Sequence, residues 1–235
     1  NDPQELDRVL TVLGQVQAEF NEGARRGMQV SLADVIVIGG AAAIEQAAQS
    51  AGINVDVPVV PGRGDATQTQ TDIPSFDLLQ PSADAFRNHY DASRAYRSDV
   101  EMLIDKADQL QLTVSEMTAV VGGMRALNAN AGGNAHGVLT QRPGVLTTDF
   151  FVTLLDRSVQ WHKTDEPNVF VGHVDGAQEA AYTATTVDMV FGAHPELRAV
   201  AETYAYDDAQ QRFVADFISA WTKVMTLDRF DLSTD

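Results

Sequence analysis

The sequence predicts a mainly α-helical domain with long loops and a small β-hairpin, in one domain over residues 1–235. Three observations predict it: apolar residues recur at helical spacing, capping patterns precede these runs, and two apolar segments each carry a double glycine. At 235 residues, 44% of them hydrophobic, the chain can bury a sizeable core.

The first helix is expected to begin at the N-terminus. Asp2 is a capping residue, Pro3 suits the first helical position, and Glu5 follows in the first turn. Apolar residues then recur at helical spacing as far as Gly23, namely Leu6, Val9, Leu13, Val16 and Phe20.

Two more capping patterns predict helices further along the chain. Ser31 with Asp34 opens a helix that ends near Gly52, and Thr113 with Glu116 opens one that ends near residues 128–130. Apolar spacing predicts further helices at residues 82–90, 99–109, 148–157, 195–205 and 208–225.

Long loops are expected between these helices. Residues 53–80 carry three prolines and a polar run, and residues 130–146 are rich in Gly and Asn, so both are predicted to be irregular. Residues 158–184 hold two β-favouring pieces, SVQWH and VFVGHV, which predict a hairpin.

The segment ADVIVIGGAAAIEQAAQSAGINVDV, residues 33–57, has two interpretations. It is either the first strand and turn of a nucleotide-dependent oxidoreductase or a buried helix. Ala41 and Ile44 stand where a dinucleotide fingerprint needs glycines, which favours the helix. A glycine inside a helix costs about 1 kcal/mol relative to alanine. We therefore expect close packing against Gly39 and Gly40.

The second double glycine lies in TAVVGGMRALNAN, residues 118–130, and Met124 follows it. A methionine can ligate haem iron, so a haem-binding domain that uses Met124 is one interpretation. In an apolar helix a methionine is far more often a core residue.

The histidines predict no metal site. His162 and His173 flank Asp165 and Glu166, yet no ligand spacing such as H-x-x-x-H supports chelation, so we expect surface-loop histidines. His194 precedes Pro195, where a capping role is expected.

The charge of the chain excludes several kinds of partner. A net charge of −17 repels phosphate backbones and anionic lipid, so no nucleic-acid or membrane partner is expected. No signal-peptide pattern is found, and the absence of Cys suits a reducing compartment, which together favour a cytoplasmic location.

Several long segments resemble the C-terminal domain of the bifunctional catalase-peroxidases. They include SLADVIVIGGAAAIEQAA, VPVVPGRGDATQTQTD, ADAFRN, LTVSEMTAVVGGMRALNAN and LTTDFFVTLLD, followed by a long final match that begins VDMVFGAHPELRAVAETYAYDDAQQRF. The resemblance extends from Asn1 to about Leu232.

The resemblance implies a haem-peroxidase-like helical domain without haem. In this family the N-terminal half binds haem b and decomposes hydrogen peroxide, and the C-terminal half keeps the fold. Met124 matches the position of the proximal histidine, and Asp188 matches the proximal aspartate. The distal helix would precede residue 1, so we expect this chain to lack the first helices of that domain.

The same resemblance implies that this chain alone is not an enzyme. No catalytic, cofactor-binding or metal-binding residue is expected in it, and Met124 and Asp188 would be vestigial. Its expected partners are the N-terminal haem domain of the same protein and a second copy in a homodimer. Its expected role is to support the active-site architecture of the haem domain.

The acidic surface generates a first prediction. The chain has 33 acidic and 16 basic residues, so its negative charges repel one another. Because salt screens this repulsion, a halophilic source is one hypothesis. We expect the midpoint of thermal unfolding to rise between roughly 0.1 M and molar KCl, since the Debye length falls to about 3 Å at 1 M. A midpoint of thermal unfolding that does not change with the KCl concentration would favour an ordinary acidic protein instead.

Overall fold

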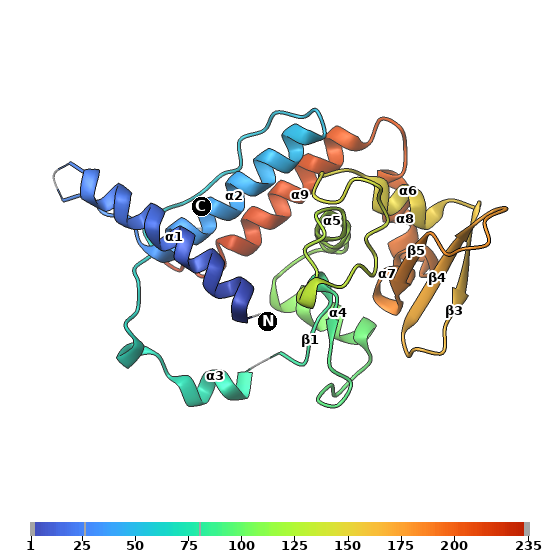
Figure 1. Cartoon of the computed structure of the whole chain (residues 1–235), viewed down its shortest axis with the longest axis horizontal. Coiled ribbons are helices and arrows are strands. Elements are labelled where there is room, and N and C mark those ends of the chain that lie inside the picture. The colour runs from blue at the N-terminus through green and yellow to red at the C-terminus, as the bar shows by residue number, and fades with distance from the viewer. Residues whose placement is uncertain (1–2, 26, 80, 233–235) are drawn as a thin grey trace.

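Helices make up most of the structure, a computed structural model that describes residues 3–25, 27–79 and 81–232 (Figure 1). This confirms the mainly α prediction. The cap predicted at Asp2 lies outside the described residues. The longer helices are α1 (Pro3–Gly23), α2 (Leu32–Ser50), α4 (Asp99–Gln109), α5 (Val114–Ala126), α8 (Pro195–Tyr204) and α9 (Gln210–Met225). The shorter ones are η1 (Gln68–Gln70), α3 (Ile73–Leu79), η2 (Ala85–Arg87), η3 (Ala131–Gly133), α6 (Asp149–Leu155) and α7 (Thr186–Ala193).

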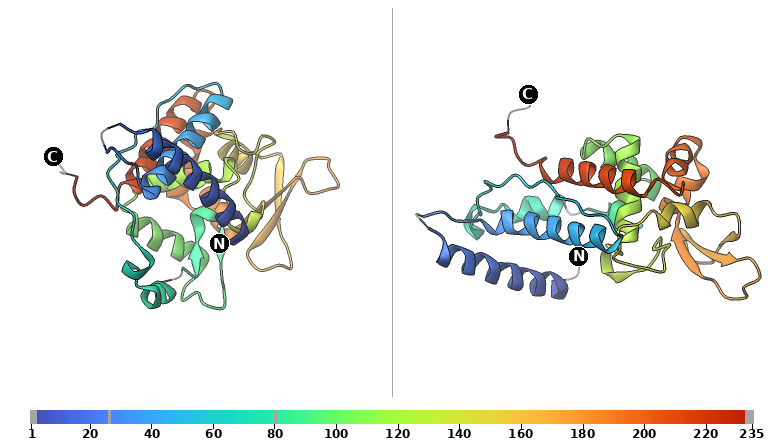
Figure 2. Two further views of the ribbon diagram at one scale, coloured as in Figure 1. Left: turned by 60° about the vertical axis from the view of Figure 1, so that its left-hand side comes forward. Right: turned by 90° about the horizontal axis from the view of Figure 1, so that it is seen from above.

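Helix α5 lies at the centre, where Figure 1 views it end-on. It packs against α6, α8, α9 and η2. Helices α1, α2 and α9 form successive layers beside it, as the view from above shows in Figure 2. Because α5 is surrounded in this way, most of its side chains are buried, including Val121 and Ala126 at zero exposure.

The capping patterns lie at helix starts as predicted. The Thr113 side chain accepts from the backbone N–H of Glu116, and the Glu116 carboxylate accepts from the N–H of Thr113. Ser31 likewise accepts from the N–H of Asp34. Asp34 does not return this bond, because its carboxylate instead accepts from the backbone of Gly62 and Arg63 in the following loop.

The helical glycines pack closely against side chains of the same chain, which confirms the expectation for Gly39 and Gly40. A Cβ atom added to Gly40 would lie 3.0 Å from the Trp221 ring, and one added to Gly39 would lie 3.3 Å from Leu13. The second pair is tighter, because a Cβ atom on Gly122 would overlap the Phe151 ring and one on Gly123 would overlap a second ring, that of Phe217.

The nucleotide-binding interpretation of residues 33–57 is wrong. Residues 32–50 form helix α2 instead of a strand, and the sheets within the described ranges are antiparallel. A Rossmann fold needs a parallel sheet with a strand before its glycine turn.

The helix predicted at 82–90 is also wrong. This segment forms β1 (Ala83–Asp84), η2 and β2 (His89–Tyr90). The carbonyl oxygens of Ala85 and Phe86 accept hydrogen bonds from a distant arginine, Arg125, and Asn88 has a left-handed backbone with φ of 53°. A continuing helix cannot meet either condition.

Two segments contain more regular structure than the sequence predicts. The Pro-rich stretch 53–80 contains η1 and α3. Pro74 lies in the first turn of α3, where proline is tolerated because the N–H that it lacks would have no partner within the helix. The expected hairpin is part of a three-stranded antiparallel sheet of β3 (Val159–Lys163), β4 (Val169–Val174) and β5 (Tyr182–Thr185). Helix α7 follows β5 directly and was not predicted.

Helix α2 is long and apolar enough to cross a membrane by length and composition, alone among the helices of the described ranges. A central helix of a globular fold passes the same test. Since α2 packs against both α1 and α9, its apolar character has an explanation within the fold.

The glycines of α5 generate a second prediction. We expect Gly123→Ala to lower the free energy of unfolding by about 1–3 kcal/mol, because the new methyl group overlaps the Phe217 ring. Gly14→Ala is the matched control: it also lies inside a helix, yet its Cβ meets nothing within 4 Å. It should stabilise the chain by up to about 1 kcal/mol. Equal effects of the two variants in urea unfolding would contradict the packing.

Candidate functional site

A buried ion pair joins α5 to α7. The Nε atom of Arg125 donates to Oδ1 of Asp188 at 2.7 Å, and both side chains have zero exposure. Charges removed from water are costly unless they are paired and hydrogen-bonded. The remaining contacts of each group therefore decide whether this arrangement is stable.

Each nitrogen atom of the Arg125 guanidinium donates to the chain. Its Nη1 atom donates to the carbonyl of Phe86 at 2.9 Å and lies 3.4 Å from Oδ1 of Asn130. Its Nη2 atom donates to the carbonyl of Ala85 at 2.8 Å. One side chain thus fixes η2, α5 and α7 relative to each other.

The carboxylate of Asp188 is equally engaged. Besides Arg125, its oxygens accept from the backbone N–H of Thr185 at 2.8 Å and lie 3.1 Å from the Thr185 hydroxyl and 3.5 Å from the Asn88 amide. Gly137, with φ of 77°, approaches so closely that a Cβ atom there would lie 2.6 Å from the carboxylate. No room is left for a further side chain at Gly137.

Met124 lies directly before Arg125 on α5. It is half-buried and packs against the hydrophobic core. Of the two residues predicted from the resemblance, Asp188 is bonded to Arg125, and Met124 packs against the core.

A small cavity of about 150 Å³ lies beside Asn88 and Thr185, two residues that contact Asp188. Its lining includes Asn88, His89, Asp99, His136 and Glu166. Burial raises the pKa of the Asp99 carboxyl, the backbone N–H of Val100 opposes that shift, and the charge of Asp188 adds to it. The surroundings of Asp99 therefore disfavour the ionised form of its carboxyl group.

The histidines that the sequence assigned to surface loops lie elsewhere. His162 is on β3 and His173 on β4, with ring centroids 5.7 Å apart. Asp165 and Glu166 do not join them: no group of three or more His, Cys, Asp or Glu side chains within the described part of the chain could hold a metal. His194 is at the N-cap of α8, as predicted, but its side chain makes no capping bond.

Comparison with known proteins decides the family. The peroxidase family model matches residues 1–207. This chain belongs to the peroxidase family. A catalase-peroxidase of Shewanella loihica is 57% identical over 229 residues, which are 97% of this chain and 30% of that protein. Catalase-peroxidase 2 of Burkholderia ambifaria is 55% identical, and that of Legionella pneumophila 53% identical, each over 233 residues, 99% of this chain and 31% of the relative.

The peroxidase-family chain thus spans about 30% of the length of the curated relatives that it matches. The resemblance to catalase-peroxidases predicted from the sequence is confirmed. Helix α5 carries the double glycine and Met124, and α7 carries Asp188.

Sequence reasoning missed Arg125 as the partner of Asp188. The signal was present, because Arg125 ends the apolar run TAVVGGM and Asp188 stands within the apolar run TTVDMVF. A charged side chain in such a run is almost never fully buried unless it is paired. Two opposite charges in two buried helices therefore indicate an ion pair.

This ion pair generates a third prediction. We expect Arg125→Met to lower the free energy of unfolding by about 3–5 kcal/mol, because it leaves the Asp188 charge buried and unpaired. The double variant Arg125→Met with Asp188→Asn should lose less. The control is Arg198→Met, which breaks the exposed pair with Glu202 and should cost about 0–1 kcal/mol in urea unfolding. A comparable loss in the Arg125 and Arg198 variants would contradict the buried pair.

Proposed function

We propose that this chain is the haem-free C-terminal domain of a catalase-peroxidase. Its role is to support the active-site architecture of an N-terminal haem domain of the same protein and to contribute to a homodimer in the cytoplasm. The parent protein would decompose hydrogen peroxide and oxidise donors with it, through haem b in the other domain. The family match and the 53–57% identity to catalase-peroxidases support this assignment.

The junction of α5 and α7 carries the proposal that this chain holds no haem. A proximal aspartate assists haem binding by accepting a hydrogen bond from the ligating imidazole. Here Asp188 accepts instead from Arg125, and Met124 stands at the expected ligand position with its side chain against the core. The residues present therefore do not fit the role of a proximal haem pair.

The packing around the double glycines supports the same conclusion. Phe151 and Phe217 occupy the space beside Gly122 and Gly123, and Phe213 stacks edge-on against Phe151 at 5.5 Å. A flat cofactor beside these glycines would have to displace aromatic rings that are themselves fully buried.

Helix α1 offers a surface for the proposed partner. None of its described residues is buried, and one apolar row is exposed by 44–53%: Leu6, Val9, Val12, Val16 and Phe20. Exposed apolar rows of this kind mark interaction surfaces. The proposed support of the haem domain is a coupling between domains, which requires that contact here favours the active arrangement.

Reconstitution tests the proposal. Adding the chain to the haem domain of a catalase-peroxidase that lacks this part should raise peroxide turnover at least about fivefold, the lower end of usual coupling between sites. Peroxide loss, followed by its ultraviolet absorbance, is the readout, and turnover unchanged by the chain would contradict the proposal.

A pair of surface variants controls that experiment. Val12→Asp changes the exposed row of α1 and should abolish the recovery. Leu78→Asp changes an exposed apolar residue of α3, which is 87% exposed, and should leave the recovery intact. Equal recovery with both variants would exclude α1 as the contact.

A further inference from the structure

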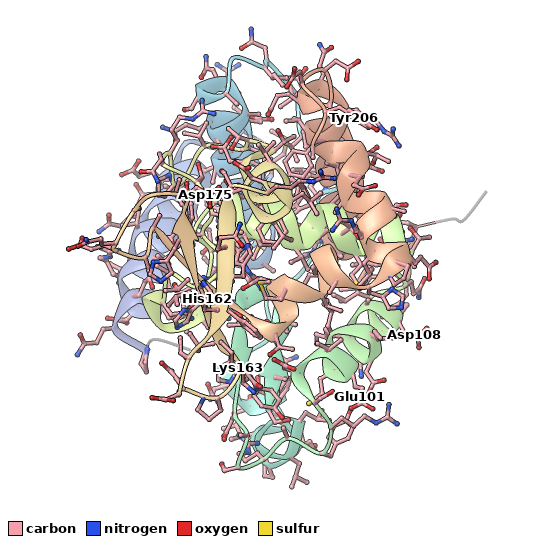
Figure 3. The ribbon with its side chains drawn as sticks, turned by 90° about the vertical axis from the view of Figure 1, so that its right-hand side faces the viewer. Glu101, Asp108, His162, Lys163, Asp175 and Tyr206 are labelled. Carbon is pink, nitrogen blue, oxygen red and sulfur yellow. The ribbon has the colours of Figure 1, made fainter. Side chains whose placement is uncertain are left out.

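His162 and His173 face each other across two strands. In the antiparallel pairing of β3 with β4, Gln160 is opposite His173 and Val171 is opposite His162. The two histidines are thus diagonal neighbours on one face of the sheet, since side chains alternate along each strand. Figure 3 shows this side of the molecule with His162 labelled on its strand.

Along β3 and β4 the two faces of the sheet differ in exposure. The face opposite the histidines carries Val159, Trp161 and Gly172, where Gly172 is buried and approaches the Trp161 ring to 3.0 Å at its Cβ position. The histidine face is open instead: His162 is exposed and His173 half-buried. An ion from solvent can reach both rings without disturbing the fold.

The spacing of the rings suits a shared metal ion. Their centroids are 5.7 Å apart, and the ring planes are inclined by 68°. With metal–nitrogen bonds of about 2.0–2.1 Å, two imidazoles on one ion have centroids roughly 4.5–6.5 Å apart. The β ladder sets the backbone separation of the two histidines, so binding needs no movement of either strand.

The side chains on this face select the kind of ion. Both donors are imidazole nitrogens, which suit Cu²⁺, Ni²⁺ and Zn²⁺ and do not suit Mg²⁺ or Ca²⁺. Gln160 lies on the same face, and its amide nitrogen donates to the carbonyl of Arg157 at 2.9 Å, which leaves its amide oxygen available to bind a metal ion. Water completes a site of this kind.

We propose that His162 and His173 form a two-histidine site for a divalent transition-metal ion, with Cu²⁺ bound more tightly than Ni²⁺ or Zn²⁺. Bound metal links β3 to β4 and fastens the three-stranded sheet. This site is separate from the junction of Arg125 and Asp188, and it does not depend on the role proposed for the whole chain.

Calorimetric titration of the 235-residue chain with Cu²⁺ tests the site. We expect one tight equivalent of Cu²⁺, and an affinity at least about tenfold lower in His162→Gln and in His173→Gln, because each change removes one of two nitrogen donors. His194→Gln is the matched control: His194 is exposed and lies on another element, so its change should leave the affinity as it was.

Magnesium provides the second control, because a chain of net charge −17 attracts any divalent cation. A millimolar excess of Mg²⁺ should leave the tight Cu²⁺ equivalent in place. Equal Cu²⁺ affinity in all three histidine variants, or displacement by Mg²⁺, would overturn the proposal.

Electron paramagnetic resonance of the unaltered chain gives an answer that needs no variant. One equivalent of Cu²⁺ should give a spectrum with hyperfine splitting from two imidazole nitrogens. A spectrum of oxygen coordination alone would place the ion among the surface carboxylates and reject the two-histidine site.

Discussion

The buried ion pair between Arg125 and Asp188 is the constraint on which the centre of this structure depends. Both side chains have zero solvent exposure, so hydrogen bonds from the surrounding backbone must replace the water that each charge has lost. The carbonyls of Ala85 and Phe86 are turned toward Arg125, and the N–H of Thr185 is turned toward Asp188. The short elements around residues 83–90 and the start of α7 take their shape from these bonds.

Close packing of helices sets the second layer of organisation. The glycines of α5 let the rings of Phe151 and Phe217 approach the helix backbone, and the glycines of α2 do the same for Leu13 and Trp221. Each glycine costs helix stability, and that cost is offset by the apolar area that packs against it. Both pairs thus have a structural explanation that needs no cofactor.

Local patterns in the sequence predict much of this fold. The caps at Ser31 and Thr113 mark the starts of α2 and α5, and Pro195 marks the start of α8, because each signal acts within one helical turn. The resemblance to catalase-peroxidases points to Met124 and Asp188 through the residues that flank them in the matching segments.

The features that the sequence did not predict depend on contacts between distant residues. Segment 82–90 has helical apolar spacing, yet Arg125, some 40 positions away, engages its carbonyls. The proximity of His162 and His173 follows from strand register, which neither histidine reveals by itself.

We propose that this chain binds no haem, because Asp188 accepts from Arg125 and Met124 packs against the core. Titration of the chain with haem b, followed by absorbance in the Soret region, tests it most directly. We expect only weak, unsaturable changes that are the same in the chain and in Met124→Ala. A sharp, saturable Soret band that disappears in Met124→Ala would contradict the claim.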